Sequence, residues 1–199
     1  MLDLYCWESK FETCYYSERL LKKLSLLNET SNQKINISEV KKAIYYAKKY
    51  HGNQKRQTGE PYYSHPLEVA YMSADYRFKT DVIITSILHD TIEDTQLTEK
   101  MINYIFGSVI GSQVENLTRI KKTRKISSSE MVKSLLQQKK DDLLCIKYFD
   151  RLHNMQTIKI KAPEKIIEIT RETLDMFLSL SSYLKIRNTE QNLLINSCI

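Results

Sequence analysis

The segment 88–94 places two metal-binding residue types, His89 and Asp90, one helical turn before two acidic residues. On a helix, residues four apart share a face, so we expect His89 beneath Glu93 and Asp90 beneath Asp94. Adjacent helical side chains diverge by about 100°, so a divalent ion held by His89 and Asp90 needs further ligands from elsewhere in the chain. The segment predicts part of a metal site with two carboxylates one turn further on.

Two other segments offer the remaining ligands. In the first segment, His65 stands before a proline that suits the first turn of a helix. In the second, Asp150 lies one helical turn before His153 and Asn154. Taken singly, His65 is also explained as a turn residue and Asp150 as a surface ion-pair partner. The apolar run 82–88 places the carboxylate of Asp90 at the end of a buried helix, where it needs a cation or several donors. Together these patterns predict one metal site with four ligands: His65, His89, Asp90 and Asp150.

Four segments of the chain resemble the hydrolase domain of RelA/SpoT homologues, in that family's order and at its approximate spacing. They are residues 51–62, 64–70, 88–95 and 150–155, and the similarity spans about residues 38 to 186. The resemblance implies an all-α fold, the HD-domain helical bundle of the metal-dependent phosphohydrolase superfamily. It implies Mn2+-dependent removal of the 3′-pyrophosphate of the alarmones ppGpp and pppGpp, which degrades the signal of the stringent response and yields GDP or GTP and pyrophosphate.

The resemblance also implies a role for each site residue. Glu93 and Asp94 become the acidic pair that handles the attacking water, and adjacency alone does not decide which of them is the base. Two imidazoles and two carboxylates suit one Mn2+ ion, although they also permit Fe2+, Co2+ or Zn2+. Such an ion eases the deprotonation of water and polarises a phosphoryl oxygen. The implied nucleotide-binding residues are Arg56, Gln57, Thr58, Asn154 and Thr157.

Departures from the family pattern leave other functions open. Gln57 stands where the family commonly has a basic residue, which permits another nucleotide substrate, such as the 2′-phosphate of NADPH. Tyr148 and Phe149 replace a smaller pair before Asp150 and could shift that ligand by crowding its helix. A catalytically weak module that binds a nucleotide or a partner is therefore a third possibility. Residues 170–177 resemble the helix that leads to a synthetase domain in long family members, and we expect no such domain here.

A helical scaffold must position these residues. Only four glycines and three prolines are present, which is too few turn residues for a many-stranded protein. We expect Ser38, Thr80 and Thr98 to cap helices, the last ending near Gly107. The other expected helices cover residues 15–28, 65–76, 108–120, 129–155 and 163–183, with a serine linker at 127–129. The predicted organisation is an N-terminal helical extension (1–37), the hydrolase domain (38–186) and a tail (187–199).

The net charge of +6 and the pI of about 9.0 favour anionic partners. We expect four cations near the pocket, where they attract a guanine nucleotide: Lys48, Lys49, Lys55 and Arg56. The second basic run, 119–125, is expected to be a solvated loop. No aromatic-basic interleaving accompanies the charge, so the sequence does not indicate nucleic-acid binding.

The cysteines and the apolar segments bear on the compartment. Cys6, Cys14, Cys145 and Cys198 have no zinc-site spacing and suggest reduced thiols. The first residues lack a basic signal-peptide region, and no apolar stretch is long enough to span a bilayer. We therefore expect a cytoplasmic protein without a membrane segment; the sequence does not predict its oligomeric state.

Overall fold

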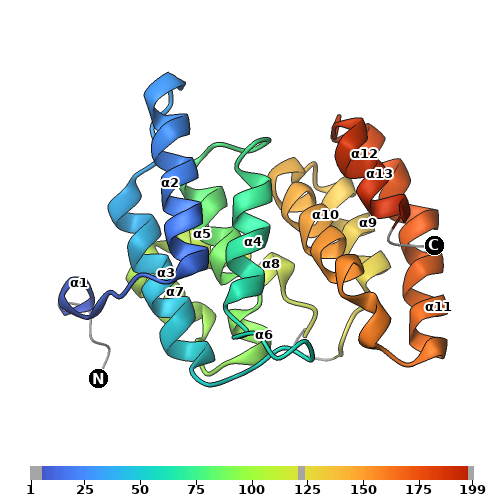
Figure 1. The fold of residues 1–199 in the computed structure, drawn as a ribbon, viewed down its shortest axis with the longest axis horizontal. Helices are drawn as coiled ribbons and strands as arrows, with labels where there is room; N and C mark the ends of the chain where they lie inside the picture. The colour runs from blue at the N-terminus through green and yellow to red at the C-terminus, as the bar shows by residue number, and fades with distance from the viewer. Residues whose placement is uncertain (1–5, 121–123, 197–199) are drawn as a thin grey trace.

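The computed structural model describes residues 6–120 and 124–196, and their regular structure is helical apart from isolated bridges between Lys55 and Pro61 and between Ile120 and Lys125 (Figure 1). The first half contains α1 (Trp7–Lys10), α2 (Tyr15–Thr30), α3 (Ile37–His51), α4 (Ser64–Ser73), α5 (Thr80–Leu88), α6 (Thr91–Asp94), α7 (Glu99–Phe106) and α8 (Ser108–Leu117). The second contains α9 (Ser128–Gln137), α10 (Asp141–Gln156), the 3-10 turn η1 (Ile158–Ile160), α11 (Pro163–Glu172), the π-helical turn η2 (Thr173–Phe177), α12 (Leu178–Tyr183) and α13 (Asn188–Asn196). The all-α prediction is confirmed.

Two hydrophobic clusters form the core, and α4 and α5 contribute to both. The first cluster joins α2, α3, α7 and α8 to these two helices, while the second joins α9, α10 and α12 to Val69 and Val82. Every residue of α5 from Val82 to Leu88 is almost completely buried. Burying a Val, Leu or Ile side chain stabilises a fold by about 1.5–3 kcal/mol. The helix that leads to His89 is therefore firmly held at the junction of the two clusters.

The helix α2 packs within the chain. Leu20 and Leu24 are fully buried in the first cluster. The Arg19 guanidinium also pairs with the Glu68 carboxylate of α4 at 2.7 Å. The predicted amphipathic helix is thus present, and its apolar face covers α3 and α4.

Helix starts were only partly predicted. Asn36, and not Ser38, caps α3, because its Oδ1 accepts the backbone N–H three residues on at 3.2 Å. Thr80 is the first residue of α5 and not its cap, and its hydroxyl instead accepts the backbone N–H of Asn36 at 3.0 Å. The Thr98 cap is confirmed, and so is the end of α7 at Gly107.

The predicted helix 129–155 is in fact two helices, α9 and α10. They separate around Lys139, which adopts a positive φ of 52° without a glycine to signal the break. The predicted serine linker is also wrong, because Ser127 forms a capping box with Glu130 and its neighbours begin α9. The helix from 108 ends earlier than expected, at Leu117, whereas Pro163 begins a helical run to residue 183 as predicted.

The ends of the described chain pack on the helical body. The α13 helix contacts α10, and Arg187 just before it pairs with Asp75 at 3.3 Å. Cys6, Cys14 and Cys145 carry free thiols, while Cys198 lies outside the described residues. Within the described ranges, no helix combines the length and apolar character that crossing a bilayer requires.

Candidate metal centre and surrounding cavity

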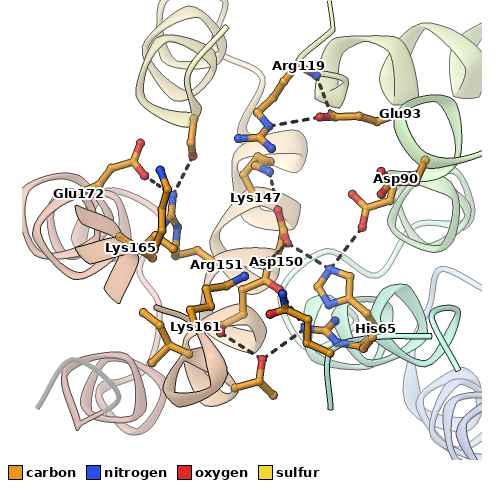
Figure 2. A pocket seen from close by; sticks show the side chains of 18 of the residues that line it. His65, Asp90, Glu93, Arg119, Lys147, Asp150, Arg151, Lys161, Lys165 and Glu172 are labelled. Atoms are coloured by element: carbon orange, nitrogen blue, oxygen red, sulfur yellow. Dashed lines mark hydrogen bonds and ion pairs between the residues drawn. The ribbon is translucent and has the colours of Figure 1, made fainter. Parts of the chain in front are cut away.

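The structure brings the four predicted ligands together from three separate places. His65 lies in the first turn of α4, His89 and Asp90 at the junction of α5 and α6, and Asp150 in the middle of α10. Ligand atoms of His65, His89 and Asp150 lie within 4.8 Å of one another. Asp90 lies 3.5 Å from His65 Nε2 (Figure 2) and 3.1 Å from His89 Nε2. The cluster has the composition and the convergence of a divalent-metal site.

The orientation of His89 fits a bound cation. Its Nδ1 lies 2.8 Å from the Ser86 carbonyl oxygen, so Nδ1 carries a proton and Nε2 is the nitrogen left for a metal ion. Nε2 is buried and has no hydrogen-bond partner among the described residues. The Asp90 carboxylate lies 3.1 Å from this nitrogen, and an ion between the two would satisfy both groups.

The charges around the cluster also favour a cation. Burial acts to raise the pKa of Asp150, but the Lys147 ammonium and the histidines outweigh it and hold the pKa well below its usual value. Burial acts to lower the pKa of His89, but Asp90 outweighs it and raises the pKa to about 9, so without a metal ion Nε2 also binds a proton, which a bound ion would displace. The carboxylates are therefore ionised, and they draw positive charge into the space between them.

Two further contacts hold Asp150, and the sequence analysis missed one of them. The Lys147 ammonium pairs with Oδ2, while Asn154 Nδ2 donates to Oδ1 at 2.6 Å. Lys147 is 8% exposed in the structure. The only signal that the sequence offered was its position one helical turn before Asp150. Tyr148 and Phe149 are fully buried in the second cluster. Despite these large neighbours, Asp150 lies 3.2 Å from the Nε2 of the predicted ligand on α4.

The predicted helical alignment holds for one pair, because the Asp94 backbone N–H donates to the Asp90 carbonyl at 2.9 Å, but the helix is interrupted at His89 and Asp90. The helix α5 ends at Leu88 and α6 begins at Thr91. Glu93 points to the segment after α8, where it accepts the Arg119 backbone N–H at 3.0 Å and lies 3.3 Å from the Lys125 ammonium. Asp94 instead accepts a hydrogen bond from the Tyr62 hydroxyl at 2.6 Å. The two carboxylates therefore occupy different environments.

Tyr62 is a second residue that the sequence analysis missed. Its ring stacks on His51 with centroids 4.7 Å apart, and burial strongly raises the pKa of its hydroxyl, so it remains a donor. Gln54 fixes the same region, because it contacts His51 Nδ1 and donates to the Asp94 backbone carbonyl, both at 2.8 Å. Asp94 is accessible from the cavity, yet the surrounding protein withdraws enough water to raise the pKa of its carboxyl.

A cavity of about 1030 Å³ opens beside the metal cluster and is lined by residues from both halves of the chain (Figure 2). Its wall contains Arg56 and Gln57, and Arg56 Nη2 donates to Asn154 Oδ1 at 3.1 Å and to Thr157 Oγ1 at 3.3 Å. Four of the five predicted nucleotide-binding residues therefore line the cavity. Thr58 does not; its hydroxyl contacts Glu60 at 3.4 Å.

The basic residues are arranged differently from the expectation. Of the four cations expected near the pocket, only Arg56 lines it; Lys48, for example, donates to the Glu12 carbonyl at 2.8 Å. Arg119 and Lys125 do line the cavity, although the run that contains them was predicted to be a solvated loop. Arg124 of that run is exposed and pairs with an acidic residue of α9, as a solvated loop residue would. Lys121 and Lys122 lie outside the described residues.

The fold and the site define an all-helical domain with two histidines and two carboxylates clustered beside a partly basic cavity. The HD domain family model matches residues 43–186. The chain belongs to the HD domain family.

Several relatives carry RelA/SpoT-type names. The chain is 36% identical over 182 residues to a GTP pyrophosphokinase rsh of Brucella suis, which covers 87% of this chain and 24% of that protein. It is 35% identical over 158 residues to a guanosine-3′,5′-bis(diphosphate) 3′-pyrophosphohydrolase of Aquifex aeolicus, covering 78% of this chain and 23% of that protein. The resemblance to the hydrolase domain of RelA/SpoT homologues is confirmed, and the chain spans about a quarter of the length of these curated relatives.

A solved structure supports the fold. It is described as a metazoan ortholog of SpoT that hydrolyzes ppGpp, and it aligns with a TM-score of 0.56 and 19% sequence identity. The alignment covers 81% of this chain and 92% of that chain. The helical arrangement around the cavity is therefore that of a known fold.

Proposed function

We propose that this chain hydrolyses the 3′-pyrophosphate of ppGpp and pppGpp with one Mn2+ ion. The observation that carries the proposal is the convergence of two imidazoles and two carboxylates beside a cavity that also contains cationic residues. Relatives named as 3′-pyrophosphohydrolases of guanosine 3′,5′-bis(diphosphate) supply the substrate class. In this reaction a water oxygen bonds to the phosphorus, the bond from phosphorus to the ribose 3′-oxygen breaks, and that oxygen leaves and takes up a proton.

The metal would be held by one nitrogen from each histidine and by oxygens of the two aspartates: His65, His89, Asp90 and Asp150. This donor set suits Mn2+, and the unpaired buried Nε2 of His89 fits an ion there. A bound divalent ion supplies Lewis-acid chemistry, because it polarises a phosphoryl oxygen and makes water easier to deprotonate. Lys147 and Asn154 keep the Asp150 carboxylate oriented for that ion.

Asp94 is proposed to accept the proton of the attacking water. Its carboxyl has a raised pKa, which brings it closer to the pH at which a general base works best. Tyr62 holds one of its oxygens and leaves the other free for water. Glu93 is proposed to act less directly, because its oxygens are already engaged by Arg119 and Lys125. It would hold these cations where an anionic substrate enters.

The proposed nucleotide wall consists of Arg56, Gln57, Asn154 and Thr157. Arg56 is held by Asn154 and Thr157, so its guanidinium is ordered before a nucleotide arrives. Such preorganisation lowers the entropy that binding costs. A cytoplasmic location remains part of the proposal.

The test is direct. Purified protein is incubated with Mn2+ and ppGpp, and the release of GDP and pyrophosphate is followed, with Asp90→Ala as the loss variant. The matched control is Asp175→Ala, which removes an exposed carboxylate that does not line the cavity. Release by the wild type and by the control, but not by Asp90→Ala, is the expected result. Absence of release by a folded, metal-loaded wild type would contradict the proposal.

One observation favours a second substrate. Gln57 lines the cavity as a neutral side chain where the family commonly has a basic one, which lowers the positive charge facing a polyphosphate. NADPH carries a single 2′-phosphate, and its hydrolysis would release inorganic phosphate and not pyrophosphate. Assays with ppGpp and NADPH in parallel separate the two activities by their products. If neither is hydrolysed but nucleotide and metal still bind, the remaining interpretation is a binding module.

A further inference from the structure

Two histidines face each other beside the proposed metal centre. The Nδ1 atoms of His65 and His153 are 2.8 Å apart, and their ring centroids are 4.9 Å apart. A hydrogen bond at this distance needs one nitrogen that carries the proton and one that accepts it. The direction of this bond decides which nitrogen of His65 is left to face the carboxylates.

Arg56 fixes the direction. Its Nη1 approaches the same Nδ1 of His153 at 3.5 Å. A guanidinium is always charged and has no lone pair, so it can only donate. The His153 Nδ1 atom therefore accepts from Arg56, and the proton of the neutral ring lies on Nε2. The bond between the two rings then runs from His65 Nδ1–H to His153 Nδ1.

This direction matters because it leaves a lone pair on His65 Nε2. That atom lies 3.2 Å from Asp150 Oδ1 and 3.5 Å from Asp90 Oδ2, where a cation would sit. We propose that His153, itself oriented by Arg56, is a positioning residue that sets the tautomer of the metal ligand His65. The hydrogen bond that one ring nitrogen makes sets which nitrogen is free to bind metal.

The opposite arrangement has a different outcome. If His153 donated to His65, the proton of the neutral His65 ring would lie on Nε2 and point at the two carboxylates. That proton would occupy the direction in which a metal ion must approach. It would also leave two donors, on Arg56 and on His153, facing each other. The proposal rests on the metal centre proposed above and not on the identity of the substrate.

Nitrogen-15 NMR of the histidine rings tests the tautomers directly in the wild-type protein. We expect a protonated Nδ1 on His65 and an unprotonated Nδ1 on His153, both in the metal-free protein and after loading with diamagnetic Zn2+. Assignment of the four histidines uses His51→Gln, His89→Gln and His153→Asn as reference samples. An unprotonated His65 Nδ1 in either state would overturn the proposal, whether or not any variant folds.

Metal affinity gives a readout independent of catalysis. Leu and Asn have nearly the same size, but only Asn places an acceptor oxygen close to the position of Nδ1. We expect His153→Leu to raise the dissociation constant for Mn2+, measured from the electron paramagnetic resonance signal of the free ion, by about 10- to 100-fold. The variant His153→Asn should recover most of that loss. Circular dichroism melts of the metal-free proteins control for folding.

The outcomes separate this proposal from the proposed function. Equal Mn2+ affinity of the wild type and both folded variants overturns the role of His153. A wild type that binds no Mn2+ overturns the metal centre and this role together. A difference between Leu and Asn in a protein that releases no pyrophosphate from ppGpp supports the role of His153 and rejects only the substrate.

Discussion

The hydrogen bond between Tyr62 and Asp94 offers a quantitative test of the proposed general base. The substitution Tyr62→Phe removes only the hydroxyl, which lies 2.6 Å from Asp94 Oδ2. The phenyl ring can still stack on His51, as the tyrosine ring does with centroids 4.7 Å apart. The variant therefore tests one donor with little change in packing.

The size of the effect follows from the geometry. A hydrogen bond to a charged group contributes about 1.5–3 kcal/mol when buried. Because Asp94 is accessible from the cavity, solvent screening reduces this contribution, and about 1 kcal/mol is a suitable value. Burial raises the pKa of Asp94 and the bond from Tyr62 lowers it, so losing the bond raises the pKa further. At 1.36 kcal/mol per unit, the increase is roughly 0.7 units.

The assay is the pH dependence of kcat at saturating Mn2+ and ppGpp. A base works only when ionised, so activity falls as the pH drops through its pKa. We expect the acidic limb of the profile to move to higher pH by about half a unit to one unit in Tyr62→Phe. The matched control is Tyr104→Phe, which removes an exposed hydroxyl of a residue that does not line the cavity. A variant with lower activity but an unmoved acidic limb would refute the reasoning.

Three further predictions concern stability. Lys139→Gly relieves a positive φ of 52° and should raise the free energy of unfolding in urea by about 1 kcal/mol. A variant whose free energy of unfolding is below that of the wild type would contradict strain at this residue. Burial raises the pKa of Cys145 to about 12 from 9.0, so the folded protein retains a proton that the unfolded chain loses between these values. Wild-type stability should fall by up to about 4 kcal/mol from pH 9 to 12 relative to Cys145→Ala, and parallel pH curves would contradict this. Mn2+ at 100 times its dissociation constant should stabilise the wild type by about 2.7 kcal/mol in thermal unfolding but not Asp150→Ala, and an equal shift in both would place the ion elsewhere.

Local patterns in the sequence were sufficient to predict which residues form the cluster, and to predict most helices. Each residue of the cluster stands beside or within an apolar periodic segment, and such segments pack in the core: His65, His89, Asp90 and Asp150. Packing of three such segments against one another brings their polar residues to one point. This is why ligands that lie far apart in the sequence were predicted as one cluster.

The partners of these residues were harder to predict. The contacts of three residues depend on how the helices around the site pack against one another: Lys147, Tyr62 and His153. No local sequence pattern predicts that packing. The positions of the cations were hard to predict for the same reason. Lys48 contacts the Glu12 carbonyl and does not line the cavity, whereas Arg119, in the segment after α8, does line it. Composition predicted that basic residues would be near the cavity but did not identify which.

Helix breaks without glycine or proline were also not predictable. The helix is interrupted after Leu88, and within α6 the neighbouring side chains of Glu93 and Asp94 diverge by about 100°. In the structure Glu93 accepts the backbone N–H of Arg119, while Asp94 accepts the hydroxyl of Tyr62. Carboxylates in such different surroundings are suited to different tasks.

This division of tasks is testable by kinetics. Asp94→Asn removes the proposed base and should lower kcat with little change in KM, because ground-state binding is retained. Glu93→Gln keeps an amide oxygen for the Arg119 N–H but removes the charge that pairs with Lys125, so it should change KM more than kcat. Steady-state measurements on both variants at saturating Mn2+ decide the assignment. If Glu93→Gln has the larger effect on kcat, Glu93 and not Asp94 is the base, and the contacts of Glu93 with the basic residues must then open during the reaction.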